Sequence, residues 1–154
     1  MTDRSEKQQP EVEWIILADS AKLVGGKLYV LGGGWSVLTV HDAFPHQQLL
    51  GIAASFLVPS SWRDRQITFT AKIIAEATGK SVMEIAGELE TGVGSFGLDD
   101  FERAAMAAEA LVELHVGAYI VTARLEGSEE KRLRFHVRGI PGATPQRRGR
   151  NHTR

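Results

Sequence analysis

Two consecutive stretches of this 154-residue chain alternate between apolar and polar side chains, and this pattern restricts the possible folds more than any other feature. From Gln66 to Glu76 nearly every second residue is apolar, and from Met83 to Leu89 the apolar positions alternate with Glu84 and Glu88. A period of two is the geometry of a β-strand that buries one face. Because the intervening residues 77–80 suit a turn, the sequence predicts a β-hairpin.

Other segments share this strand character, being short, rich in β-branched or aromatic residues, and bounded by turn residues. They are residues 12–18, 27–31, 35–40, 49–58, 119–125 and 132–138. Several short strands at such intervals predict an all-β domain in which two antiparallel sheets pack as a sandwich, either immunoglobulin-like or jelly-roll-like. We expect a single domain over residues 11–139, preceded by a disordered leader (1–10) and followed by a disordered basic tail (140–154).

The segment from Asp99 to Leu114 gives contradictory signals. Its many alanines and its Asp99-Asp100 start favour a helix by local propensity. An all-β neighbourhood favours instead a strand that begins near Ala107. We predict a loop or one short helix near 99–110, followed by a strand.

The stretch GGKLYVLGGGWSVL, residues 25–38, contains three consecutive glycines, Gly32, Gly33 and Gly34. A dinucleotide-binding loop needs a third glycine at position 37 and a following helix, but residue 37 is valine and a strand-like run follows. We therefore interpret the three glycines as a bend or bulge that carries the chain from one sheet to the other. Trp35, directly after them, is either a lid on the core or a contact residue.

Alternation and apolar character also predict the residues of the core. They are Trp14, Ile16, Leu28, Val30, Ile67, Phe69, Ile73, Ile85, Leu89, Tyr119, Val121, Phe135 and Val137. The sequence Gly117-Ala118-Tyr119 resembles the tyrosine corner of immunoglobulin-like sandwiches, in which the tyrosine hydroxyl binds a nearby backbone group.

The patterns that carry catalysis or metal binding are missing from the sequence. There is no cysteine and no G-x-S-x-G motif. Thr78-Gly79-Lys80-Ser81 resembles the end of a P-loop, but Ile74 stands where the first glycine is required. The spacing of His41 and His46 suits solvated loop side chains better than metal ligands. We expect no catalytic residue, no cofactor and no metal, and thus a protein that is not an enzyme.

Charge is distributed unevenly along the chain. Residues 131–154 contain eight Lys or Arg and no Asp or Glu, so the other 130 residues hold ten basic and all nineteen acidic side chains, a balance of −9. The candidate contacts for an anionic partner are Arg124, Arg132, Arg134, His136 and Arg138 on two strands, and Arg147, Arg148 and Arg150 in the tail. These residues could protect an edge strand, dock on an acidic protein face, or bind phosphates without reading sequence.

Two segments, Trp14–Ala21 and Gly26–Trp35, carry a resemblance to a known family. They are similar to the N-terminal signature LADxAxxxxGKLYVLGGGW of an uncharacterised, mainly actinobacterial domain family of unknown function, with similarity from about Glu11 to Val137. The resemblance implies a small β-rich domain and supplies no catalytic residues. Members often have a proline-rich connection where this chain has the alanine-rich Phe101–Ala110.

These observations favour a non-catalytic binding or assembly module. We expect it to bind a protein partner or a second copy of itself through sheet faces or edges, with help from the basic tail. Sequence-independent association with nucleic acid is the first alternative, and an enzyme of small-molecule metabolism is the second. Because the chain has no apolar run of roughly 18 residues and no apolar leader, we expect a cytoplasmic protein without a membrane partner.

Overall fold

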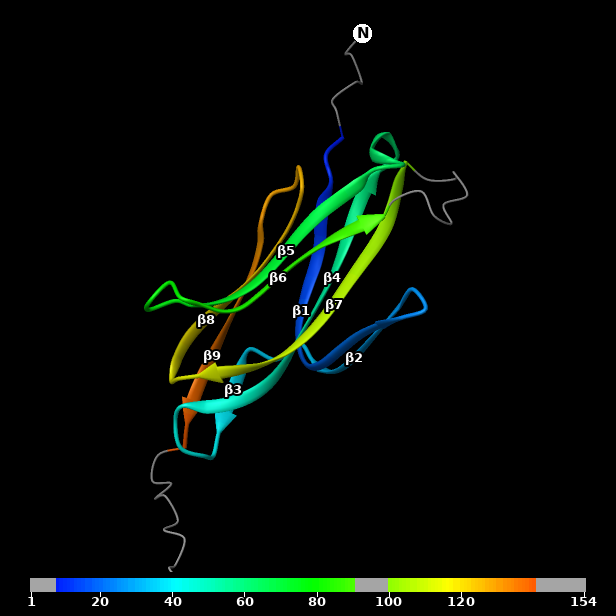
Figure 1. The fold of residues 1–154 in the computed structure, drawn as a ribbon. Helices are drawn as coiled ribbons and strands as arrows, with labels where there is room; N and C mark the ends of the chain where they lie inside the picture. The colour runs from blue at the N-terminus through cyan, green and yellow to red at the C-terminus, as the bar shows by residue number, and fades with distance from the viewer. Residues whose placement is uncertain (1–7, 91–99, 141–154) are drawn as a thin grey trace, which may run out of the picture.

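Nine β-strands and one 3-10 turn make up the part of the chain that the computed structural model describes, residues 8–90 and 100–140 (Figure 1). The strands are β1 (Glu11–Val24), β2 (Lys27–Gly33), β3 (Val37–Val40), β4 (His46–Pro59), β5 (Gln66–Ala75), β6 (Ser81–Glu90), β7 (Phe101–Leu114), β8 (Gly117–Leu125) and β9 (Lys131–Gly139). The turn, Ser60–Trp62, joins β4 to β5. Residues 1–7 of the predicted leader and 141–154 of the predicted tail lie outside the described residues.

The strands form two packed sheets. Sheet A has the order β2-β1-β4-β7, and sheet B has the order β3-β9-β8-β5-β6. All neighbouring pairs are antiparallel except β3 and β9, which are parallel. The predicted two-sheet sandwich is therefore confirmed, and so is the hairpin of β5 and β6, in which Gln66 lies opposite Glu90.

The predicted helix near 99–110 is wrong. From Phe101 onward the chain is strand β7, which pairs with β4 without interruption from Pro59–Phe101 to His46–Leu114. Alanine favours a helix only in the absence of competing contacts. Here the hydrogen bonds to β4 and the burial of alternate side chains, including Met106 and Val112, outweigh that preference.

The core lies between the two sheets. Its largest fully buried side chains are Phe56, Phe135, Leu17, Leu50, Ile52, Ile67, Ile73, Leu114, Leu125, Val58, Val112 and Val121. Six of the predicted core residues are buried: Ile67, Ile73, Tyr119, Val121, Phe135 and Val137. Phe69, Ile85 and Leu89 are half-buried and pack against this core. All nine of these residues belong to sheet B, and they pack against Leu17, Leu50, Phe56, Leu114 and other buried residues of sheet A.

Trp14 and Ile16 were predicted to lie in the core, but they are only half-buried and project from the opposite, outer face of sheet A. The cause is a β-bulge in β1, where the register against β4 shifts between Val12 and Trp14. A bulge adds one residue to one strand and so reverses which positions face inward. After it, Leu17 rather than Ile16 is fully buried.

The second half of β1 and all of β2 form a hairpin that we call the arm, residues 20–33. Pairing of β1 with β4 ends at Ala18, opposite Gly51, but pairing of β1 with β2 continues to Val24. Figure 1 shows this hairpin projecting beyond the sheets. Leu28 and Val30, predicted as core, are half-buried because they belong to the arm.

The three glycines lie where the chain leaves sheet A. Strand β2 ends at Gly33 and β3 begins at Val37 in sheet B. Gly32 and Gly34 have φ angles of +60° and +84°, in the left-handed region that glycine tolerates. Trp35 is half-buried, and its ring meets that of Phe135 edge-to-face at 5.7 Å. The connection therefore crosses between the sheets, and Trp35 packs against the core.

Candidate interaction surfaces

The outer face of sheet B carries the cationic side chains that the sequence singled out. Arg132, Arg134, His136 and Arg138 are all exposed on β9. On β8, Thr122 lies opposite Arg132, so these two side chains share a face. Arg124 is two residues after Thr122 in the same strand and therefore projects from that face too. The structure therefore brings these five side chains together, whereas Arg147, Arg148 and Arg150 lie outside the described residues.

Acidic residues neutralise part of this face. Arg134 binds Glu76 at 2.8 Å, and Arg132 binds Glu130 at 2.8 Å. Exposed pairs of this kind contribute little to stability, but they reduce the positive charge that is available to a ligand. Within residues 8–90 and 100–140, Arg124 and Arg138 form no ion pair, and Arg138 donates to the Thr39 hydroxyl at 3.0 Å.

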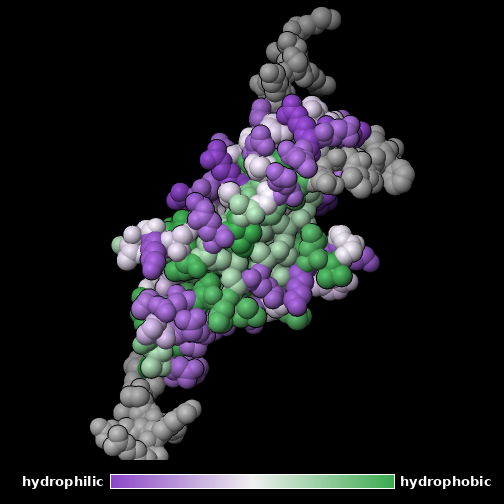
Figure 2. Space-filling view, viewed as in Figure 1, coloured by the Kyte–Doolittle hydropathy of each residue, from purple (hydrophilic) through white to green (hydrophobic). Residues whose placement is uncertain are grey.

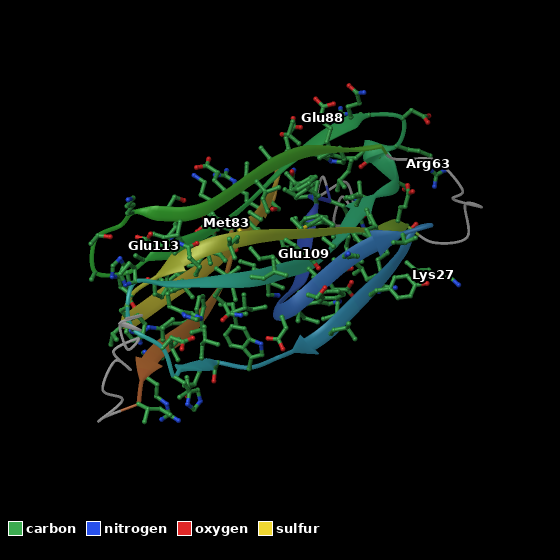
Figure 3. The ribbon with its side chains drawn as sticks, turned by 60° about the horizontal axis from the view of Figure 1, so that its bottom comes forward. Lys27, Arg63, Met83, Glu88, Glu109 and Glu113 are labelled. Atoms are coloured by element: carbon green, nitrogen blue, oxygen red, sulfur yellow. The ribbon has the colours of Figure 1, made fainter. Side chains whose placement is uncertain are left out.

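The same face becomes acidic at its other edge. On β6, Glu84 and Glu88 project outward, and Glu84 binds Lys72 of β5 at 3.5 Å. Figure 3 labels Glu88 at the far side of the molecule from the arm. The outer face of sheet B thus changes sign from β9 to β6, and its described residues do not form a uniformly basic platform.

The middle of the outer face of sheet A is built largely from small apolar residues, of which Ala18, Gly51 and Ala53 are themselves buried; we call it the alanine face. Its members are Trp14, Ile16 and Ala18 on β1, Leu49, Gly51 and Ala53 on β4, and Ala105, Ala107 and Leu111 on β7. Leu49 and Leu111 lie directly opposite each other, and 43% and 66% of their surfaces are exposed. Figure 2 shows a green band through the middle of the molecule, where Figure 1 places β7, with purple on both sides.

Two carboxylates hold this face together by joining β1 to β7 across β4. Glu13, the bulge residue, accepts from Nε and Nη2 of Arg103 at 2.8 and 2.9 Å, and from the Ser55 hydroxyl at 2.8 Å. These bonds, above all the one from Arg103, hold the pKa of Glu13 below its ordinary value. Glu13 is thus engaged in structural contacts.

Glu109 on β7 anchors the arm (Figure 3). Its Oε1 accepts a hydrogen bond from the Ser20 hydroxyl and another from the Ala21 N–H at 2.9 Å. The hydroxyl bond, more than any other contact, lowers the pKa of Glu109, although burial opposes it. The arm can reach this carboxylate because Gly51 has no side chain, and a Cβ there would lie 2.7 Å from the Ala21 nitrogen.

The anchor is expected to weaken in acid. A carboxyl whose folded pKa lies below its unfolded value stabilises the fold above that unfolded value, near 4.5, and loses this contribution as the pH falls through the folded pKa. Urea unfolding of the parent and of Glu109→Gln, from pH 7 to pH 3, should therefore show a steeper loss of stability below about pH 4.5 in the parent. Parallel pH profiles would contradict this role for Glu109.

A pocket of about 550 Å³ opens between the β5–β6 turn and the β7–β8 connection. Its polar lining includes Thr78, Lys80, Glu113 and His115, and its apolar lining is alanine, valine and Tyr119. Lys80 belongs to a turn between two strands, so the P-loop-like sequence precedes no helix. No group of three or more His, Asp or Glu side chains suited to a metal ion occurs among the described residues.

The Tyr119 hydroxyl closes the β7–β8 connection at one wall of this pocket. It accepts from the His115 N–H at 2.9 Å and donates to the His115 carbonyl at 3.4 Å. The ring is buried and stacks on Phe135 at 5.3 Å. This geometry is that of a tyrosine corner.

Sequence reasoning missed the alanine face and its Glu109 anchor. The alanines of β7 were interpreted as helix-forming, although Gly51 and Ala53 in the neighbouring strand already indicated a site where backbones approach closely. The contact between Ser20 and Glu109 joins residues 89 positions apart, so no local pattern could predict it.

Comparison with known proteins finds a matching family model and no curated relative. Within the described residues, no helix has the length and apolar character that a membrane crossing requires. A search of curated proteins finds no match. A family model described as "Family of unknown function (DUF6941)" matches residues 13–138, most of the chain and nearly all of its strands. The chain therefore belongs to this family of unknown function, DUF6941.

Proposed function

We propose that this domain is a non-catalytic binding or assembly module that contacts another protein through the alanine face and the arm. One observation carries the proposal: large apolar side chains stay exposed on the arm and on strands β4 and β7 of sheet A. Leu31 is 70% exposed, Leu111 is 66% exposed and Tyr29 is 56% exposed. Contiguous exposed apolar surface on a water-soluble domain is typical of a protein-binding site.

The contacts of the arm place these side chains near one another. Leu31 lies opposite Ser20 in the arm, so both project from the same side of the hairpin. The Ser20 hydroxyl binds Glu109, and Leu111 follows Glu109 on the same face of β7. These contacts support our proposal that Leu31 of the arm and Leu111 of β7 belong to one interaction surface.

Charged substitutions on this surface should abolish binding. We expect a Leu31→Asp, Leu111→Asp variant to capture none of the proteins that the parent captures from a lysate of the native host, as quantified by mass spectrometry. Val116→Asp is the matched control, because Val116 is equally exposed at 63% but lies at the β7–β8 connection. If the double variant with an unchanged melting temperature captures the same proteins, the proposal fails.

The basic tail is proposed to assist through charge attraction. Residues 141–154 contain Arg147, Arg148, Arg150 and Arg154 and no acidic residue. Truncation after Ile140 should weaken partner capture at low salt and leave it unchanged at high salt, because exposed charge pairs are screened. Equal capture by both forms at low salt would show that the tail takes no part.

Nucleic-acid association is the second candidate, supported by the described cations Arg124 and Arg138 that form no ion pair with described residues. Phosphate binding would appear in filter-binding assays as retention at about 50 mM salt that falls steeply at about 200 mM. The pairing of Arg132 and Arg134 with glutamates favours the opposite result, no retention at either salt concentration. Retention that is lost in an Arg124→Ala, Arg138→Ala variant would establish this second function instead.

A further inference from the structure

Strand β7 is the longest edge strand among the described residues, and its charged side chains Glu102, Arg103, Glu109 and Glu113 leave an uncharged run from Ala104 to Ala108. It runs for 14 residues, contains no proline, lysine or glycine, and pairs with β4 without a bulge. The other edges are less open. Strand β3 has four residues, β2 contains the left-handed Gly32, and the pairing of β6 with β5 has a register shift between Ser81 and Met83. Long, regular edge strands are templates for pairing with a further strand.

The hydrogen bonds of β4 show which backbone groups of β7 are open. Ser60 N–H donates to Asp100 O at 2.8 Å, and Ser60 and Asp100 continue the β4–β7 register by one residue. Hydrogen-bonded and non-hydrogen-bonded pairs alternate along an antiparallel ladder. The even-numbered residues of β7 therefore bind β4. From Phe101 to Glu113, the odd-numbered residues direct their N–H and C=O groups to the open edge.

We infer that the partner of this edge is a second copy of the chain, bound antiparallel through β7 with a twofold axis beside Ala108. The inference rests on the proposed assembly function and names its partner. An antiparallel β7 pair must place odd-numbered residues opposite odd-numbered residues, because only these have open backbone groups. Every second register meets that condition, and these registers differ in which side chains they place opposite each other.

The axis at Ala108 gives the best side-chain pairs on the outer face. Arg103 lies opposite Glu113 of the second copy, and Leu111 lies opposite Ala105 of the second copy, each pair occurring twice. Opposite charges directly across strands stabilise pairing. The small Ala105 makes room for Leu111, which is 66% exposed in the single chain.

Neighbouring registers are less favourable. With the axis at Ala107, Arg103 meets Leu111 and Ala105 meets Glu109. With the axis at Glu109, two like charges meet directly, which destabilises pairing. With the axis at Met106, Arg103 meets Glu109, whose carboxylate already binds Ser20 and Ala21. The Glu113 side chain is 56% exposed, and its contacts with Gln47 at 3.3 Å and His115 at 3.6 Å are longer than the 2.9 Å bond from Ala21 to Glu109. In either register Arg103 must share or exchange its bonds to Glu13.

The arm contacts β7 at Glu109, which in this register lies opposite the small side chain of Ala107 in the second copy.

One substitution tests the edge without disturbing β4. Ala107→Pro removes an N–H that points to the open edge, and proline is tolerated at such edge positions. Light scattering should give twice the chain mass of 16.9 kDa for the parent at about 100 µM and 16.9 kDa for Ala107→Pro, with equal circular dichroism. A monomeric parent, or a dimer that persists in a folded Ala107→Pro variant, would overturn the inference. If Ala107→Pro does not fold, the cysteine variants below decide.

Single cysteines report the register, because the chain has no cysteine of its own. At the axis, the two Ala108 residues would form a non-hydrogen-bonded pair with Cα atoms about 4.5 Å apart, within the range of a disulfide. Under mild oxidation Ala108→Cys should form a covalent dimer at least about tenfold faster than Ala107→Cys or Met106→Cys, and a mixture of Ala105→Cys and Leu111→Cys should form the mixed dimer. Faster cross-linking of Ala107→Cys or Met106→Cys would overturn the register.

This test separates the inference from the proposed function. If the parent is monomeric but the Leu31→Asp, Leu111→Asp variant still loses its captured protein, the self-pairing inference is wrong and the assembly function stands. If the parent dimerises through Ala108 and captures only its own copies, both stand. If the double variant keeps both the dimer and the captured proteins, the alanine face and the arm are not the interaction surface.

Discussion

Replacement of Phe135 by alanine is expected to lower the free energy of unfolding by about 3–5 kcal/mol, the usual cost of removing a buried aromatic ring. The Phe135 ring is fully buried and stacks on Tyr119 at 5.3 Å. It also meets the edge of Trp35 at 5.7 Å. Because these rings come from β8, β9 and the connection between the sheets, the cavity would loosen the packing at three elements. Urea unfolding measures the difference.

The control for this prediction is the same substitution at an exposed site. Phe101 is 38% exposed on β7, so Phe101→Ala should cost less than about 1.5 kcal/mol. Phe135→Leu retains most of the side-chain volume, so its loss of unfolding free energy should lie between the losses of the two alanine variants. This variant keeps the comparison possible if Phe135→Ala does not fold. Equal losses for Phe135→Ala and Phe101→Ala would contradict the assignment of Phe135 to the core.

Replacement of Gly51 by alanine is expected to cost about 1–3 kcal/mol, as added bulk does in a tightly packed site. The new Cβ would lie 2.7 Å from the Ala21 nitrogen and 2.9 Å from the Ser20 carbonyl carbon, so the arm must move off β4. That movement would break the bonds from Ser20 and Ala21 to Glu109. Hydrogen exchange at the Ala21 amide should therefore become faster.

A double-mutant cycle tests this mechanism. Glu109→Ala removes the anchor without adding bulk, so the two substitutions should be less than additive when they are combined in one chain. Additive losses would show that Gly51→Ala acts somewhere other than the arm. The cycle is informative because both residues contact the same short segment, Ser20–Ala21.

Local pattern was sufficient for much of the fold. The alternation of β5 and β6 predicted a hairpin that the register confirms. Strand segments separated by turn residues predicted a two-sheet sandwich, which the topology confirms. Such predictions succeed because the period of two follows from backbone geometry, which depends only on neighbouring residues.

Local pattern was not sufficient where both faces of a strand are apolar. In β1, Trp14, Ile15, Ile16 and Leu17 have no period of two, so the sequence did not indicate which side faces inward. The bulge at Glu13 settled that, and it depends on pairing with β4. In β7, alanines that favour a helix became a strand because β4 supplied hydrogen bonds along its whole length.

The features of the candidate surfaces can likewise be divided into those that local sequence predicts and those that depend on distant contacts. The sequence by itself determined that Arg132, Arg134, His136 and Arg138 share one face, because alternate residues of a strand do so. Only the tertiary structure decided that Glu76 neutralises Arg134 across 58 positions, and that the arm crosses Gly51 to reach Glu109. Strand periodicity is a property of adjacent residues, whereas charge pairing and backbone crossings arise only when distant segments are packed together.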